Sequence, residues 1–148
     1  GLAQGCQGPG VRKTTPVRFA PDRLVLVGGD ASALPRVRAE AHALWLAREL
    51  VNAPASELYP ETFAAVAADS GRAHNFAVEV WDESRLAAER MGSLLAVARG
   101  SARPARLAIL RYTGNPGGPT LGLVGKGVTF DSGGLSLKPS DAMVDMKG

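Results

Sequence analysis

Strand-like and helix-like segments alternate along most of this 148-residue chain. Runs such as "FAVEVWD" at residues 76–82 alternate apolar and polar side chains, which is typical of strands with one buried face. Strands that alternate with helices usually form a layered α/β structure, in which parallel strand pairs are common. The pattern therefore predicts an α/β fold with a mostly parallel sheet flanked by helices. The expected strands cover residues 23–29, 76–82, 105–114 and 120–127.

The expected helices are marked by apolar spacing and by the residues at their ends. Val37, Ala41 and Leu44 recur at three- to four-residue spacing, which places them on one helical face. Pro60 suits the first turn of a second helix, and Gly71 is a typical stop. These signals predict helices over residues 35–52, 56–71 and 83–92, whereas residues 93–101 are ambiguous.

Composition narrows the class of protein. Hydrophobic residues make up 45% of the chain and charged residues 21%, as in an ordinary globular domain. No apolar run approaches the roughly 20 residues of a membrane span, and the net charge of +3 comes from scattered arginines rather than a basic block. We therefore expect neither a membrane nor a nucleic-acid partner. Cys6 is the only cysteine, which excludes an internal disulfide and fits a reducing compartment such as the cytoplasm.

The stretch "GKGVTFDSGGLSLKP" at residues 125–139 concentrates the chemistry of the chain. It follows the last expected strand, and open α/β sheets bind ligands beyond the carboxyl ends of their strands. Three of the four lysines, Lys126, Lys138 and Lys147, lie in or just after it, although the chain otherwise prefers arginine. An amine can lose its proton and a guanidinium cannot, so a site that needs a neutral nitrogen must use lysine. Asp131 could bridge two hard cations, and the glycines let the backbone approach a metal or substrate closely.

Other interpretations of this stretch fit less well. A phosphate-binding loop needs glycine where Thr120 stands and a hydroxyl where Gly127 stands. The segment "DSGG" resembles the surroundings of a serine-protease nucleophile, but His42 and His74 lie in or beside expected helices and the α/β pattern contradicts a β-barrel. A glycine-rich surface turn with solvated lysines is the remaining structural alternative.

Three segments of the chain carry a family resemblance. "VGKGVTFDSGGLSLKPSDAMVDMKG" resembles the signature region of the leucyl aminopeptidase (cytosol aminopeptidase) family. "LARELVNAPASELYPETFA" resembles the stretch that opens that family's catalytic domain, and "MGSLLAVARGSARPARLAILRY" is similar to its middle strands. The resemblance covers about residues 36–148.

The resemblance implies a two-metal exopeptidase that removes N-terminal residues from peptides. It implies that Lys126 donates its amine to one metal, that Asp131 bridges both metals, and that Lys138 is the catalytic side chain that polarises the scissile carbonyl. Two divalent ions, Mn, Zn or Mg, would activate water and hold the free amine of the substrate. The family also implies peptide substrates, a homo-oligomer of six subunits and a cytoplasmic location.

The resemblance further implies a truncated catalytic domain. The next metal ligand of the family would be the residue that follows Gly148, and the remaining carboxylate ligands lie further on. We therefore expect residues 1–35 to be the tail of an N-terminal domain with a linker, and residues 36–148 to be the first half of a metallopeptidase catalytic domain. The fragment alone is expected to be inactive. The alternative is a non-catalytic scaffold or binding protein that has kept the aminopeptidase fold.

Overall fold

The computed structural model describes residues 14–15 and 21–147, so Cys6 lies outside the described residues. A first compact unit holds η1, α2 and η2, and a second covers Pro54–Val144. The elements in chain order are η1 (Ala31–Ala33), α2 (Leu34–Asn52), α3 (Pro60–His74), β1 (Ala77–Trp81), α4 (Glu83–Ala88), α5 (Gly92–Ala98), β2 (Leu107–Arg111), α6 (Ser140–Val144) and η2 (Asp145–Lys147).

In the first unit, α2 confirms the helix expected over residues 35–52. Asp30 starts the helical stretch, because its Oδ1 accepts a hydrogen bond from the Ser32 N–H at 2.8 Å and η1 leads directly into α2. A side-chain acceptor at this position satisfies an N–H group that has no carbonyl partner. The helix ends at Asn52, two residues before Pro54, as expected from the poor fit of proline in a continuing helix.

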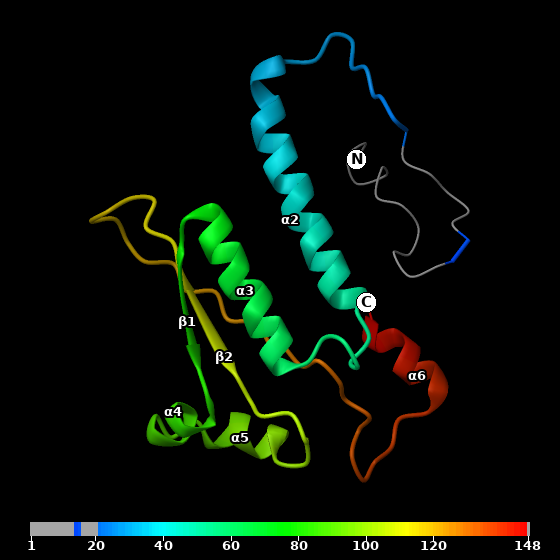
Figure 1. Ribbon diagram of the computed structural model, residues 1–148, viewed down its shortest axis with the longest axis vertical. Helices are drawn as coiled ribbons and strands as arrows, with labels where there is room; N and C mark the ends of the chain where they lie inside the picture. Colours follow the sequence, from blue (N-terminus) through cyan, green and yellow to red (C-terminus); the bar gives the residue numbers. More distant parts are fainter. Residues whose placement is uncertain (1–13, 16–20, 148) are drawn as a thin grey trace. The chain divides into compact units, whose positions relative to one another are not determined.

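The second unit contains a two-stranded sheet (Figure 1). β1 and β2 confirm the strands expected within residues 76–82 and 105–114. Val78 lies opposite Leu110 across the sheet. The architecture is α/β, but β1 and β2 run antiparallel, so the described strands do not show the mostly parallel sheet that the sequence predicts.

Two expected strands are wrong within the described residues. Residues 23–29 and 120–127 have no regular secondary structure. A strand is held by hydrogen bonds to a neighbouring strand, and neither segment has such a neighbour in the described part of the chain. Leu121 is 81% exposed and Leu123 is 87% exposed. The apolar side chains that suggested a strand here therefore have no described face to pack against.

Helix α3 covers the sheet and packs against both β1 and β2 (Figure 1). It confirms the second expected helix but continues beyond the expected stop at Gly71 to His74, where Asn75 ends it in a left-handed conformation at φ 56°. Gly71 is instead a packing position. A Cβ at Gly71 would lie 2.5 Å from Cγ2 of Val78, so glycine allows the helix to approach β1 closely.

The core of the second unit is small. Leu86 on α4 is completely buried, and α4 packs against β1 and α5. Helix α5 resolves the ambiguous segment at residues 93–101 as mainly helical. Several large apolar side chains remain exposed, such as Val97 at 76%. Among the described helices, none has the length and apolar character that a membrane crossing requires.

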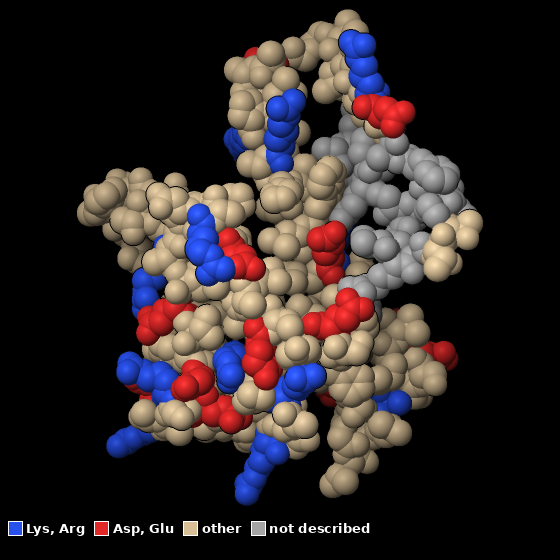
Figure 2. Space-filling model, in the orientation of Figure 1, with Lys and Arg blue, Asp and Glu red and all other residues tan. Residues whose placement is uncertain are grey.

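Charged side chains of both signs are interspersed on the face shown in Figure 2. Exposed ion pairs among the described residues include Arg36–Glu40 at 2.7 Å, Arg85–Glu89 at 2.7 Å and Arg111–Glu79 at 2.9 Å. Exposed pairs of this kind contribute only about 0.2–1 kcal/mol each to stability. The stability of the second unit therefore depends mainly on the packing around the sheet.

Candidate metal centre

The candidate residues lie in loops of the second unit, after the sheet. Lys126 is exposed and stands in the irregular segment that follows β2, and Lys138 lies two residues before α6 begins at Ser140. Gly127 fixes part of this segment, because a Cβ at that position would lie 2.9 Å from Cε1 of Phe63 on α3. Only a residue without a Cβ can approach the ring so closely. The backbone next to Lys126 therefore lies against α3.

Residues 131–138 form a closed loop held by their own backbone. The Lys138 N–H donates to the Ser132 carbonyl oxygen at 2.9 Å, and the Gly133 N–H donates to Asp131 Oδ1 at 2.8 Å. Gly133 has φ 91°, in the region that glycine favours. A Cβ on Gly133 would lie 2.2 Å from the Ser136 carbonyl oxygen. The closed form of the loop thus requires glycine at this position.

The loop brings Asp131 and Lys138 together. Lys138 Nζ lies 2.9 Å from Asp131 Oδ1 and donates to the Asp131 carbonyl oxygen at 3.3 Å. The side chains are partly buried, with exposed fractions of 26% for Lys138 and 39% for Asp131. Hydrogen bonds from the Lys138 ammonium and the Gly133 N–H, together with the positive charges of Lys138 and Lys126, lower the pKa of Asp131. Asp131 is therefore a carboxylate at neutral pH.

Lys126 and Asp131 offer part of a metal-binding shell. Divalent ions bind carboxylate oxygens readily, and a neutral amine adds a nitrogen ligand. The positive charge of Lys126 is the smallest of the influences that lower the pKa of Asp131. Within the described residues, no group of three or more His, Cys, Asp or Glu side chains could complete a site. The donor types fit a divalent ion, and further ligands from outside the described residues would be needed to hold it.

Sequence patterns did not identify the positions that shape this centre. Gly127 makes room for Phe63, and Gly133 makes room for the loop's own backbone. That the glycines of the stretch also admit a metal or substrate stays a prediction. Phe63 and Gly127 are far apart in the chain, so no local pattern could pair them. The tight turn had a local signal, since adjacent glycines often occupy positions with positive φ.

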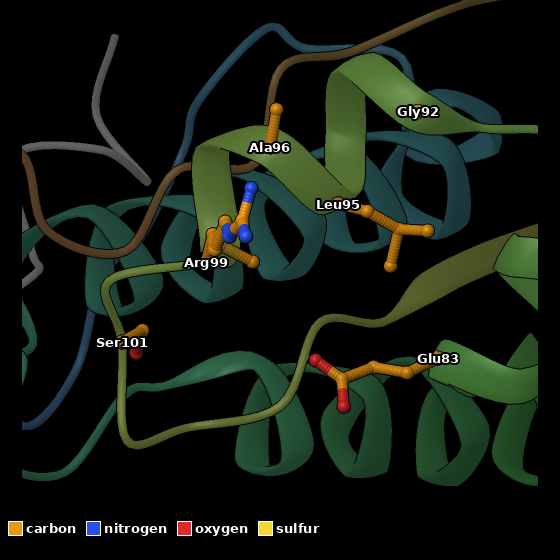
Figure 3. Close-up of a pocket in the computed structure, with 7 residues that line it drawn as sticks. Glu83, Gly92, Leu95, Ala96, Arg99 and Ser101 are labelled. Atoms are coloured by element: carbon orange, nitrogen blue, oxygen red, sulfur yellow. The ribbon is translucent and has the colours of Figure 1, made fainter.

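A separate hollow lies beside α4 and α5 (Figure 3). It has a volume of about 510 Å³. Glu83 and Arg99 are among its lining residues, and Glu83 Oε1 also accepts a hydrogen bond from the Ala105 N–H at 3.2 Å. None of Lys126, Asp131 and Lys138 lines it. The hollow and the candidate metal centre are therefore different places on the second unit.

The second unit thus places an amine beside a carboxylate in a loop that precedes α6. Comparison with known proteins shows to which family the chain belongs. Residues 45–148 match the model of the cytosol aminopeptidase family, catalytic domain. The chain belongs to the cytosol aminopeptidase family.

Curated relatives agree with this assignment. The chain is 43% identical over 147 residues to a probable cytosol aminopeptidase of Rhodopirellula baltica, covering 99% of this chain and 29% of the relative. It is 52% identical over 123 residues to a probable cytosol aminopeptidase of Leifsonia xyli subsp. xyli, covering 80% of this chain and 24% of the relative. The chain thus spans 24–29% of the length of these two relatives.

Proposed function

We propose that the protein carrying this chain is a metal-dependent aminopeptidase that releases N-terminal amino acids from peptides. The observation that supports this most directly is the loop of residues 131–138, in which Asp131 and Lys138 lie together in a chain of the cytosol aminopeptidase family. The similar proteins from Rhodopirellula baltica and Leifsonia xyli are both named probable cytosol aminopeptidases. The proposal extends that activity to this protein.

Each candidate residue has a distinct role in the proposed reaction. Lys126 and Asp131 would hold two divalent ions, Mn, Zn or Mg, which supply Lewis acidity for activating water when bound. Lys126 must be neutral to offer a lone pair, and a neighbouring divalent charge favours that form. Lys138 would donate a hydrogen bond to the carbonyl oxygen of the scissile bond, where negative charge develops.

We also propose the domain organisation and the assembly of the whole protein. We assign residues 1–35 to the tail of an N-terminal domain with a linker, and residues 36–148 to the first half of the catalytic domain. We also propose that the whole protein has a mostly parallel sheet flanked by helices. A cytoplasmic homo-hexamer acting on peptides completes the proposed assembly.

The test compares two carboxylates of the full-length protein. Asp131→Ala should lose bound metal and leucine-anilide hydrolysis, because the described residues contain no group of three or more His, Cys, Asp or Glu side chains that could hold a metal ion instead. Asp141→Ala removes a carboxylate from the first turn of α6 and should keep both. Metal content is measured by elemental analysis and activity by release of the anilide product.

The outcome also separates the enzyme from its alternative. Activity and metal content that survive Asp131→Ala would refute the assigned role of Asp131. A full-length protein that binds no metal and hydrolyses no aminoacyl anilide would favour the non-catalytic scaffold.

A further inference from the structure

The two oxygens of Asp131 are not equivalent. Oδ1 receives the Lys138 ammonium at 2.9 Å and the Gly133 N–H at 2.8 Å. Within the described residues, Oδ2 accepts no hydrogen bond. One oxygen therefore already has a cationic partner, while the other is available to a second cation.

The position of Lys138 is set by the loop and not by chance contact at the surface. Its N–H donates to Ser132, and its ammonium also donates to the Asp131 carbonyl oxygen at 3.3 Å. Its Cγ would lie 3.2 Å from a Cβ on Gly133, so the stem of the side chain runs along the turn. Only 26% of the side chain is exposed. The backbone N–H and the side-chain ammonium of Lys138 thus both form hydrogen bonds within the loop, and together they hold the ammonium at Asp131 Oδ1.

A carboxylate that bridges two metal ions through both of its oxygens offers one oxygen to each ion. An ion that binds through Oδ2 displaces nothing among the described residues. An ion that binds through Oδ1 would share that oxygen with the Lys138 ammonium, and two cations at one oxygen repel each other strongly. The two binding steps should therefore differ in what they displace.

We propose that Lys138 acts as an exchangeable cation of the centre: the second metal ion takes Asp131 Oδ1 by displacing the Lys138 ammonium. The inference rests on the proposed function, since it assumes two ions at Asp131. The displaced ammonium stays tethered by the loop and becomes available to a substrate carbonyl. Lys138 is then a positioning residue for Asp131 before loading and a substrate-facing group after it.

The experiment measures metal binding, not turnover. The full-length protein is stripped with a chelator and titrated with Mn²⁺ by calorimetry, as wild type and as the Lys138→Met, Lys138→Gln and Lys138→Arg variants. Both neutral variants should strengthen the second binding step about two- to fivefold, the range expected for removing one partly exposed ion pair. The first step should change less than twofold. Lys138→Arg keeps the competing charge and should bind like the wild type.

The outcomes separate the two proposals. If wild-type protein binds no Mn²⁺, the proposed metal centre fails. If it binds two ions but the neutral variants leave both steps unchanged, or strengthen both equally, the exchange at Oδ1 is refuted while the metal centre stands. Weaker binding in the neutral variants would show that Lys138 supports the ligands and does not compete with the metal. Circular dichroism of each stripped variant confirms that it is folded.

Discussion

Replacing Gly133 by alanine is expected to open the loop of residues 131–138. The new Cβ would lie 2.2 Å from the Ser136 carbonyl oxygen, well inside the 3.0 Å that real Cβ contacts respect. The obstacle is backbone, so the chain must move by roughly 1 Å to admit the methyl group. A shift of that size breaks the 2.9 Å hydrogen bond from Lys138 to Ser132.

Two contributions determine how much Gly133→Ala destabilises the closed loop. An alanine at φ 91° costs about 1–3 kcal/mol of backbone strain, and the lost loop hydrogen bond costs about 0.5–1.5 kcal/mol. Together these amount to about 1.5–4.5 kcal/mol, which raises the population of the open loop relative to the closed loop about 10- to 2000-fold. Gly134→Ala is the matched control. Gly134 also has a positive φ, of 68°, but a Cβ at that position would meet no atom within 4 Å. Gly134→Ala should therefore cost only the backbone strain of alanine at positive φ, about 1–2 kcal/mol.

Hydrogen exchange of the Lys138 backbone amide reports this opening directly in the full-length protein. The Gly134→Ala variant should exchange about 5- to 30-fold faster than the wild type, and Gly133→Ala faster again. Equal exchange rates in the two variants would refute the clash with Ser136 as the reason for glycine at position 133.

Two further predictions concern the sheet and its helices. Leu86→Ala should lower the free energy of unfolding, measured by urea titration, by about 2–5 kcal/mol because Leu86 is completely buried. Val97→Ala is the control: the Val97 side chain is 76% exposed, so the free energy of unfolding should change by less than about 0.5 kcal/mol. A similar loss in both variants would show that Leu86 is not a core residue. The hydrogen bond from the Trp81 indole and, next in size, the one from Arg111 lower the pKa of Glu79. The Glu79 carboxylate therefore contributes fully to β1–β2 pairing above the ordinary pKa of glutamate, and this contribution is lost as the pH falls through the lowered pKa. An NMR titration should show the Glu79 pKa rising in both Trp81→Phe and Arg111→Met, and an unchanged pKa in both variants would contradict these contacts.

The sequence predicted the elements whose signals are local. Alternation of apolar and polar residues located β1, and a short apolar run before the turn at residues 114–118 located β2. The apolar helical face with Pro54 beyond it located α2. Local signals do not predict which strands pair, because pairing joins residues that are far apart in the chain. The apolar run at residues 120–127 has the right pattern for a strand, yet the described residues provide no neighbour for it. The same limit explains why the antiparallel direction of β1 and β2 was not predicted.

The candidate metal centre was also predicted only in part from the sequence. Residue types and the family resemblance singled out Lys126, Asp131 and Lys138, but no pattern shows which oxygen of Asp131 receives the ammonium. That detail depends on the turn at Gly133 and on the path of the Lys138 side chain. The short helix α6 was also missed, although Asp141 in its first turn is a typical start signal.

The closed loop of residues 131–138 has a consequence for the order in which a binding site can form. Its ends are only a few residues apart, so closing it sacrifices little chain entropy. Its bonds run between its own residues, which means that the carboxylate can be oriented before any distant part of the polypeptide arrives. Ordering completed during folding does not have to be repeated when a ligand binds. A centre assembled around such a nucleus can recruit its remaining groups onto a carboxylate that is already in place.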